Sequence, residues 1–195
     1  MIYIVCALKN EAVPLIKKYD LKKAQEEKNF SIYKNENIQL VISGIGKLKS
    51  AAATAYLLKN SDKNDFAFNI GVCAGGQKIS KIGELFVAAR ILDNASNKLY
   101  FCNTNFNHNL KSSMLTTYDL PQFSPKNGLC DMEASGFFVS ALNFLHNKNI
   151  FVLKAVSDHF SEEEFKKDEV CNLIEQNING ISDFIAHNIQ LSSNL

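Results

Sequence analysis

Three largely apolar runs constrain the fold of this chain most. They occupy residues 2–8, 66–72 and 150–157, and they are rich in β-branched and aromatic side chains. Runs without apolar–polar alternation are typical of strands that are covered on both faces. Segments with helical patterns separate the runs, so the sequence predicts an α/β fold with three inner strands.

The remaining segments predict the elements around these strands. Helices are expected at residues 10–20, 48–60 and 130–147, the first capped by Asn10. A hairpin is expected at 30–43 with its turn at 34–37, and a further strand at 82–92. Residues 93–127 are polar and irregular, with short strands at 98–102 and 113–118. Ser161 and Glu164 form a capping box for one final helix. Its apolar stripe is Phe165, Leu173, Ile178, Ile181 and Ile185.

The composition indicates one cytoplasmic domain over residues 1–195. Hydrophobic residues make up 46% of the chain and charged residues 21%, as in most globular proteins. The net charge is +1 and no long basic run occurs, so neither a nucleic-acid nor a membrane partner is indicated. Five scattered cysteines without a C-x-x-C pair predict reduced thiols, and no histidine has zinc-ligand spacing with them.

Acidic residues and glycines follow the predicted strands. Glu11 follows the first run, the segment CAGG at 73–76 follows the second, and Asp158 ends the third, while Gly44 and Gly46 follow the hairpin. Ligands of open α/β sheets bind beyond the carboxyl ends of the strands, so these residues are expected to converge. Taken singly, each acid also suits a helix N-terminus and each glycine a tight turn.

Glu133 is the acid that is hardest to explain by structure alone. It lies among the apolar residues Met132, Ala134 and Phe137 in a segment predicted to be buried. An ionised carboxylate in such surroundings needs partners, because burial without them costs several kcal/mol. A ligand-binding carboxylate is favoured here over a structural ion pair.

Several segments resemble, in order, those of the nucleoside phosphorylase/hydrolase family, and especially its methylthioadenosine/S-adenosylhomocysteine nucleosidase branch. They are ALKNEAV, SGIGKLKSAAAT, NIGVCAGG followed by IGELFVA, CDMEASGFF and LKAVSDHF. The similarity covers residues 1–90 and resumes over 128–160. It implies a three-layer α/β/α fold around a mixed, curved central sheet, a shortened variable segment at 93–127, and a homodimer or higher homo-oligomer.

The resemblance also implies roles for individual residues. Glu11 would direct or deprotonate the attacking water, and Glu133, beside Met132, would hold the ribose hydroxyls. Asp158, supported by Ser157, would protonate the purine at N7. A proton delivered to the leaving base accelerates cleavage by about 10²–10⁴-fold.

The expected lining of the base and sugar site includes two departures from the family pattern. Cys73 stands where family nucleosidases carry serine, and Lys154 where they carry arginine, which has a planar fork that lysine lacks. Pro121, with Phe123 just beyond, stands where the family places an aromatic ring against the purine. The full expected lining is Ile45, Cys73, Ala74, Gly75, Lys154, Ser157 and Phe160.

Hydrolysis is favoured over phosphorolysis because the chain has a single arginine, Arg90, at the far end of its strand. A phosphate dianion binds poorly without arginines to receive it. The substrate is expected to be a purine nucleoside resembling methylthioadenosine or S-adenosylhomocysteine, with no metal or organic cofactor. A purine nucleoside phosphorylase, a futalosine-type hydrolase and a non-catalytic nucleoside-binding module remain as alternatives.

Overall fold

The computed structural model describes residues 1–24, 30–103, 109–124, 126–161 and 167–193. Strands and helices alternate along it, as the apolar runs predict. The elements are β1 (Ile2–Cys6), α1 (Lys9–Lys18), β2 (Lys22–Lys23), β3 (Ser31–Lys34), β4 (Ile38–Ile42), α2 (Lys47–Leu58), β5 (Phe66–Gly75), β6 (Leu85–Asp93), β7 (Lys98–Phe101), β8 (Lys111–Thr117), β9 (Leu129–Asp131), α3 (Ala134–Ala141), η1 (Asn147–Asn149), β10 (Ile150–Asp158), α4 (Lys167–Gln176) and α5 (Ile178–Ser193).

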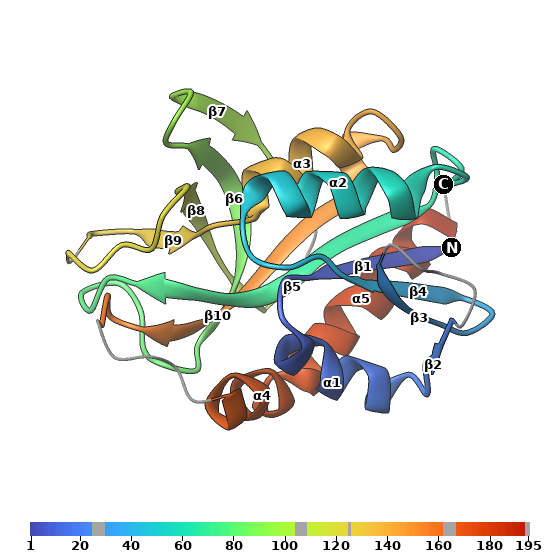
Figure 1. The fold of residues 1–195 in the computed structure, drawn as a ribbon, viewed down its shortest axis with the longest axis horizontal. Coiled ribbons are helices and arrows are strands. Elements are labelled where there is room, and N and C mark those ends of the chain that lie inside the picture. The colour runs from blue at the N-terminus through green and yellow to red at the C-terminus, as the bar shows by residue number, and fades with distance from the viewer. Residues whose placement is uncertain (25–29, 104–108, 125, 162–166, 194–195) are drawn as a thin grey trace.

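One mixed sheet organises the molecule. The three predicted inner strands lie side by side at its centre, where β5 pairs in parallel with both β1 and β10. β10 also pairs with β6, β6 with β8, β8 with β9, and β9 returns to β5. These five strands therefore close on themselves, which gives the sheet the strong curvature expected from the resemblance (Figure 1).

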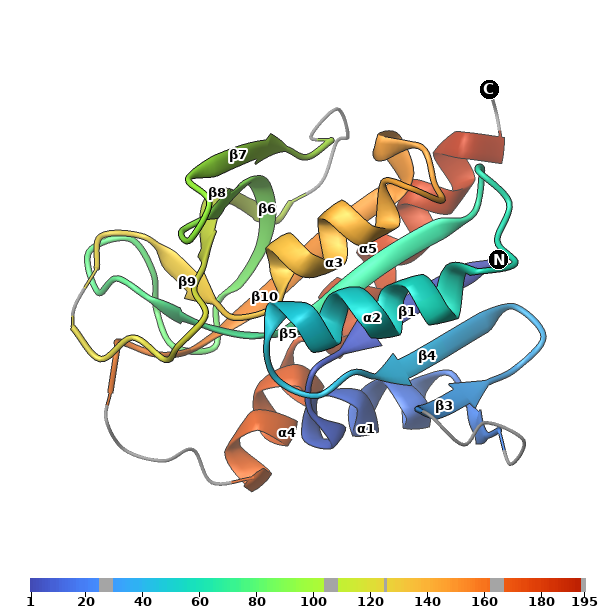
Figure 2. The same cartoon turned by 45° about the horizontal axis from the view of Figure 1, so that its top comes forward.

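Helices cover both faces of the sheet. In Figures 1 and 2, α2 and α3 lie side by side on one face, and α1, α4 and α5 lie on the other. One apolar cluster joins the inner sides of α2 and α3 to the sheet, and a second joins α1, α4 and α5 to its opposite face. The architecture is therefore the predicted three-layer α/β/α arrangement. None of the described helices is long and apolar enough to cross a membrane.

The segment predicted as a helix at 130–147 is shorter and begins with a strand. Cys130 pairs with Ala74 across β9 and β5, so the first residues extend the sheet. The Asp131 carboxylate then accepts the N–H of Ala134, and α3 runs only to Ala141. The apolar composition that suggested one long helix instead reflects burial of both the strand and the helix.

Two other helix predictions need correction. Asn10 lies inside α1, which begins one residue earlier, because the Glu11 side chain accepts the N–H of Leu8 and completes that end. The final helix is two helices, since the Asn177 side chain donates to the carbonyls of Gly83 and Leu173 where α4 gives way to α5. Ser161 is described, but its partner in the predicted capping box, Glu164, lies outside the described residues, as does Phe165.

Helices α2 and α3 approach each other closely at Gly136. A Cβ at this position would overlap the backbone carbonyl oxygen of Lys47, the first residue of α2. Only a residue without a side chain fits between the two helices here. This contact brings the glycine turn before α2 next to the start of α3.

We expect Gly136→Ala to lower the free energy of unfolding by about 1–3 kcal/mol or more, because the helices have to separate. Gly180→Ala is the matched control. A Cβ at 180, within α5, meets only Leu85 at 3.6 Å, so alanine should be neutral or stabilise by up to about 1 kcal/mol. Urea unfolding of both variants measures the difference. Equal stability of the two would show that the close approach is wrong.

Candidate active site

A cavity of about 550 Å³ opens at the carboxyl ends of β1, β5 and β10. The start of α3 and residues 120–123 complete its walls. Eight of the eleven residues proposed from the sequence line it, so the three acids 11, 133 and 158 share one cleft. These eight are Glu11, Ile45, Cys73, Ala74, Met132, Glu133, Ser157 and Asp158.

Glu11 is buried at the base of the cavity and held by backbone groups. Its Oε2 accepts the N–H of Leu8 at 2.8 Å, and its Oε1 accepts the N–H of Val72 at 2.9 Å. Burial raises the pKa of this carboxyl, while nearby Lys154 and the backbone N–H groups partly oppose the shift. The side chain is thus fixed in place and more basic than an exposed glutamate.

Gly71 makes room for the Glu11 carboxylate. It interrupts the apolar run of β5, and a Cβ there would lie 2.5 Å from Oε1 of Glu11. Sequence reasoning did not single out this glycine, although a glycine within an inner strand is a signal of close approach. The strand therefore carries a glycine where the acid crosses it.

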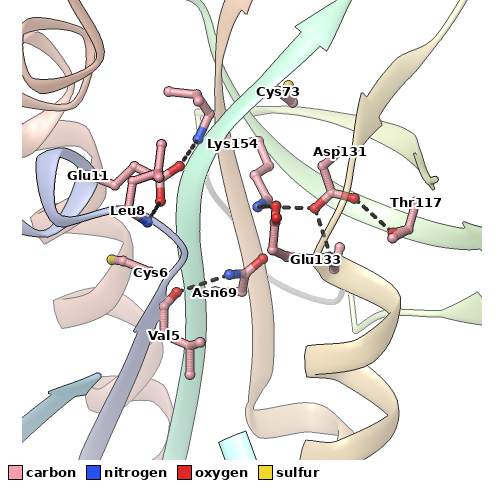
Figure 3. A network of polar contacts seen from close by, with 12 residues as sticks. Val5, Cys6, Leu8, Glu11, Asn69, Cys73, Thr117, Asp131, Glu133 and Lys154 are labelled. Atoms are coloured by element: carbon pink, nitrogen blue, oxygen red, sulfur yellow. Dashed lines mark hydrogen bonds and ion pairs between the residues drawn. The ribbon is translucent and has the colours of Figure 1, made fainter. Parts of the chain in front are cut away.

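Lys154 is a buried ammonium surrounded by carboxylates (Figure 3). Its Nζ lies 3.1 Å from Oδ2 of Asp131 and 4.0 Å from Oε2 of Glu133. Burial lowers the pKa of Lys154, but the attraction of Asp131, Glu133 and Glu11 outweighs it and holds the pKa above its usual value. Lys154 does not line the cavity, so its charge acts through the acids.

Asp131 was not among the predicted site residues. It accepts hydrogen bonds from the hydroxyl of Thr117 at 2.8 Å and from the N–H of Ala134 at 2.9 Å, in addition to its ion pair with Lys154. The acid therefore ties β8, β10 and the first turn of α3 together. The sequence signal for it was weak, because residue 131 was assigned to a helix rather than to the end of a strand.

Glu133 projects from the start of α3 toward the glycine turn before α2. Its Oε1 accepts the N–H of Gly46 at 2.8 Å. Burial raises the pKa of Glu133 from 4.5 to about 7, against the opposing effect of Lys154. The Glu133 carboxylate thus lines the cavity, where a ligand can bind it, and also lies near the ammonium of Lys154.

Asp158 ends β10 at the mouth of the cavity. Its Oδ1 accepts the N–H groups of Phe160 at 2.7 Å and Ser161 at 3.2 Å. The Ser157 hydroxyl lies 2.8 Å from Oδ2 of Asp158 and 3.0 Å from the carbonyl oxygen of Cys73. A hydroxyl has one hydrogen to donate, so Ser157 serves an ionised Asp158 as donor and a protonated Asp158 as acceptor.

Phe160 and Gly75 do not line the cavity. Phe160 has a positive φ of 66°, and its backbone N–H donates to Asp158. The carbonyl of Gly75 accepts a hydrogen bond from Nδ1 of His159 at 2.6 Å, and a Cβ at 75 would overlap the Ser80 hydroxyl. Both residues shape the backbone around Asp158.

Cys73 lines the cavity floor as an inert thiol. Burial raises the pKa of this thiol well above its usual value, so the sulfur stays protonated near neutrality. Across the cavity, Leu120, Pro121, Gln122 and Phe123 form a mostly apolar wall. Pro121 and Phe123 were expected near the base; Leu120 and Gln122 were not predicted.

Comparison with known proteins identifies the fold. No protein-family model matches the sequence, and no curated protein matches it. Solved structures do match along almost the whole chain, at 16–20% identity, which establishes a shared nucleoside phosphorylase/hydrolase fold. The resemblance expected from the sequence is confirmed at this level.

The matching structures include nucleosidases of 5′-methylthioadenosine and S-adenosylhomocysteine. The Helicobacter pylori enzyme with butyl-thio-DADMe-Immucillin-A has a TM-score of 0.78 and 17% identity, covering 95% of this chain and 97% of that one. The Arabidopsis thaliana 5′-methylthioadenosine nucleosidase has a TM-score of 0.73 and 20% identity, covering 98% and 95%. The Colwellia psychrerythraea enzyme with adenine has a TM-score of 0.74 and 17% identity, covering 97% and 94%.

The raised pKa of Glu133 predicts how a glutamine at this position changes stability with pH. The fold favours the protonated form of Glu133, so ionisation of this acid destabilises the folded protein. This destabilisation is small near the unfolded pKa of 4.5 and reaches its full size above about pH 7. Glu133→Gln keeps an oxygen for Gly46 and removes this cost. The variant should therefore gain about 2 kcal/mol more stability relative to wild type at pH 8 than at pH 5.

Urea unfolding at both pH values measures this difference. Glu36→Gln, at an exposed position of the β3–β4 turn, is the control and should show no pH-dependent gain. A gain that is equal at pH 5 and pH 8 would contradict the assigned environment of Glu133.

Proposed function

We propose that this protein hydrolyses the N-glycosidic bond of a purine nucleoside resembling 5′-methylthioadenosine or S-adenosylhomocysteine. The observation that carries the proposal is the convergence of Glu11, Glu133 and Asp158 on one cavity. The shared fold adds support, because several of the matching structures are nucleosidases. Three carboxyl groups around one cleft supply the acid, the base and the sugar-binding group that such a reaction uses.

The reaction joins the oxygen of water to C1′ of the sugar and breaks the bond from C1′ to the base. Asp158 delivers its proton to the purine. The Ser157 hydroxyl, which lies within hydrogen-bond distance of both Asp158 and the carbonyl of Cys73, then donates to the ionised Asp158. Glu11 orients the water and accepts its proton. Its two backbone hydrogen bonds leave further lone pairs for this task, and burial makes it a better base.

Glu133 holds the ribose hydroxyls in this mechanism. Each hydroxyl donates to the carboxylate, which Gly46 and Lys154 orient from the other side. Glycosidic cleavage passes through a sugar with oxocarbenium character. An excess of carboxylates around the cavity favours that developing positive charge. Met132 and Ile45 also line the cavity.

Hydrolysis is favoured over phosphorolysis by the charges of the cavity lining. Among the described residues that line it there is no arginine or lysine. The nearest buried cation, Lys154, is already paired with Asp131. A phosphate dianion would therefore meet carboxylates instead of cations.

We also propose that two copies of the chain associate through the face that carries α2 and α3. Large apolar side chains are exposed on these helices and at the cavity rim; they are Ile45, Leu48, Leu120, Phe123, Val139 and Leu142. Exposed apolar groups gathered on one face favour a protein partner. Sedimentation equilibrium tests this proposal.

The five free cysteines support the further proposal of a cytoplasmic location.

Release of free base in phosphate-free buffer tests the function. We expect adenine to be released from 5′-methylthioadenosine at the same rate with and without added phosphate. A requirement for phosphate would favour the phosphorylase alternative. Turnover of a futalosine, without turnover of 5′-methylthioadenosine, would favour the futalosine-type hydrolase. Binding of nucleosides without any release would favour a non-catalytic binding module.

Two substitutions test the proposed catalytic acids. Asp158→Asn cannot donate the same proton and Glu11→Gln cannot accept one, so each should lower kcat by about 10²–10⁴-fold. Both variants keep the shape of the cavity and should bind 5′-methylthioadenosine in calorimetry. Glu36→Gln is the control for loss of a carboxylate far from the cavity. Full activity of Asp158→Asn would overturn the proposed mechanism.

A further inference from the structure

The apolar wall of the cavity is weakly held to the rest of the molecule. Leu120 and Phe123 are 71% and 51% exposed, respectively. Within the part of the chain that the structure describes, the Gln122 amide donates to the neighbouring carbonyls of Leu120 and Pro121, both in the wall itself. The segment is tied down just before the wall, where the Tyr118 N–H donates to the carbonyl of Asp131. These contacts do not join residues 120–123 themselves to another element of the fold, so a further contact is needed to hold them over the cavity.

Asp119 provides that attachment. It directly precedes the wall, and its Oδ1 lies 2.9 Å from Nζ of Lys47. Lys47 is the first residue of α2, on a different element from the wall. The ion pair therefore joins the wall to the helix layer that covers the sheet.

Lys47 is itself firmly placed. Its Nζ lies 3.1 Å from Oδ2 of the buried Asp93, which also accepts the hydroxyl of Ser135 at 2.7 Å and the N–H and hydroxyl of Ser96 at 2.8 Å each. Although burial alone would raise it, these hydrogen bonds hold the pKa of Asp93 well below its usual value. The Lys47 backbone packs on Gly136. The ionised Asp93, held by its hydrogen bonds, thus orients the Lys47 ammonium toward Asp119.

Lys47 also adjoins the group that holds Glu133. The preceding residue, Gly46, donates its N–H to Oε1 of Glu133 at 2.8 Å. Two consecutive residues, 46 and 47, therefore connect opposite parts of the cavity. One orients a buried carboxylate and the other fastens the apolar wall.

We propose that Lys47 is a positioning residue that fastens residues 119–123 through Asp119 and so sets how tightly the cavity closes on the apolar part of its ligand. This inference rests on the proposed function for the identity of the ligand. Lys47 is not among the described residues that line the cavity. Its effect is on the wall, which contacts substrate and transition state alike, so binding changes and the chemical step does not.

Asp119→Asn is the primary test, because it breaks the pair at its more exposed end and leaves the Lys47–Asp93 contact intact. Exposed pairs are weak, so we expect KM for 5′-methylthioadenosine to rise by about two- to five-fold, with kcat unchanged. Raising the salt concentration should increase KM of the wild type and leave that of Asp119→Asn unaffected. Lys47→Arg should preserve the wild-type KM, since it retains a cation at the same place.

Hydrogen exchange of the ligand-free protein gives a second measurement that needs no activity. Backbone amides of residues 120 and 122–124 should exchange faster in Asp119→Asn, while those of α2 and α3 should be unchanged. Asp20→Asn is the control, because it breaks the exposed pair between Asp20 and Lys22 at a distant site. Its exchange over 120–124 and its KM should match the wild type.

Exchange rates over residues 120–124 that do not change in Asp119→Asn would overturn the inference, even in an active enzyme. A fall in kcat with KM unchanged would also overturn it, because it would place the effect on the chemical step. If the wild type releases no base, the proposed function fails, and the exchange measurement still decides whether Lys47 fastens the wall.

Discussion

The site depends on one buried ammonium, that of Lys154, set among three acids. Asp131 pairs with it directly, Glu133 lies at the limit of an ion pair, and Glu11 attracts it from the far side of β5. A buried carboxylate without a counter-charge costs several kcal/mol, and three of them in one region would favour unfolding or protonation. The ammonium makes the arrangement possible, yet it leaves the acids in excess. Burial raises the pKa of Glu133 to about 7, and the attraction of Lys154 limits that rise.

This imbalance links the fold to the proposed chemistry. The closed ring of strands brings the ends of β5, β9 and β10 together, which places the lysine and the acids side by side. A negative surplus next to the cavity disfavours an anionic co-substrate and favours a sugar that becomes positively charged as its bond to the base breaks. Lysine, in place of the arginine expected from the resemblance, supplies the same positive charge without the planar fork.

Local patterns in the sequence predicted much of this structure, and the shortfalls have physical causes. The inner strands and the acids at their ends could be located, because long apolar runs and the strand-end rule need only neighbouring residues. Asp131 was missed because its importance comes from its contacts with Thr117 on β8 and Lys154 on β10, which are distant from it along the chain. Lys154 was predicted to line the site, but β10 buries it behind the acids. Likewise, Gly71 became meaningful only when Glu11 was seen to cross it.

The stability of Lys154→Met across pH tests the role of this ammonium most directly. Methionine fills a similar volume but leaves Asp131 and Glu133 without a cation. We expect the free energy of unfolding to fall by about 3–5 kcal/mol at pH 8 and by clearly less at pH 5, where Glu133 is protonated. Adding Asp131→Asn to Lys154→Met should recover part of the loss at pH 8. A loss below about 1 kcal/mol that is the same at both pH values would contradict the claim that Lys154 holds the site together.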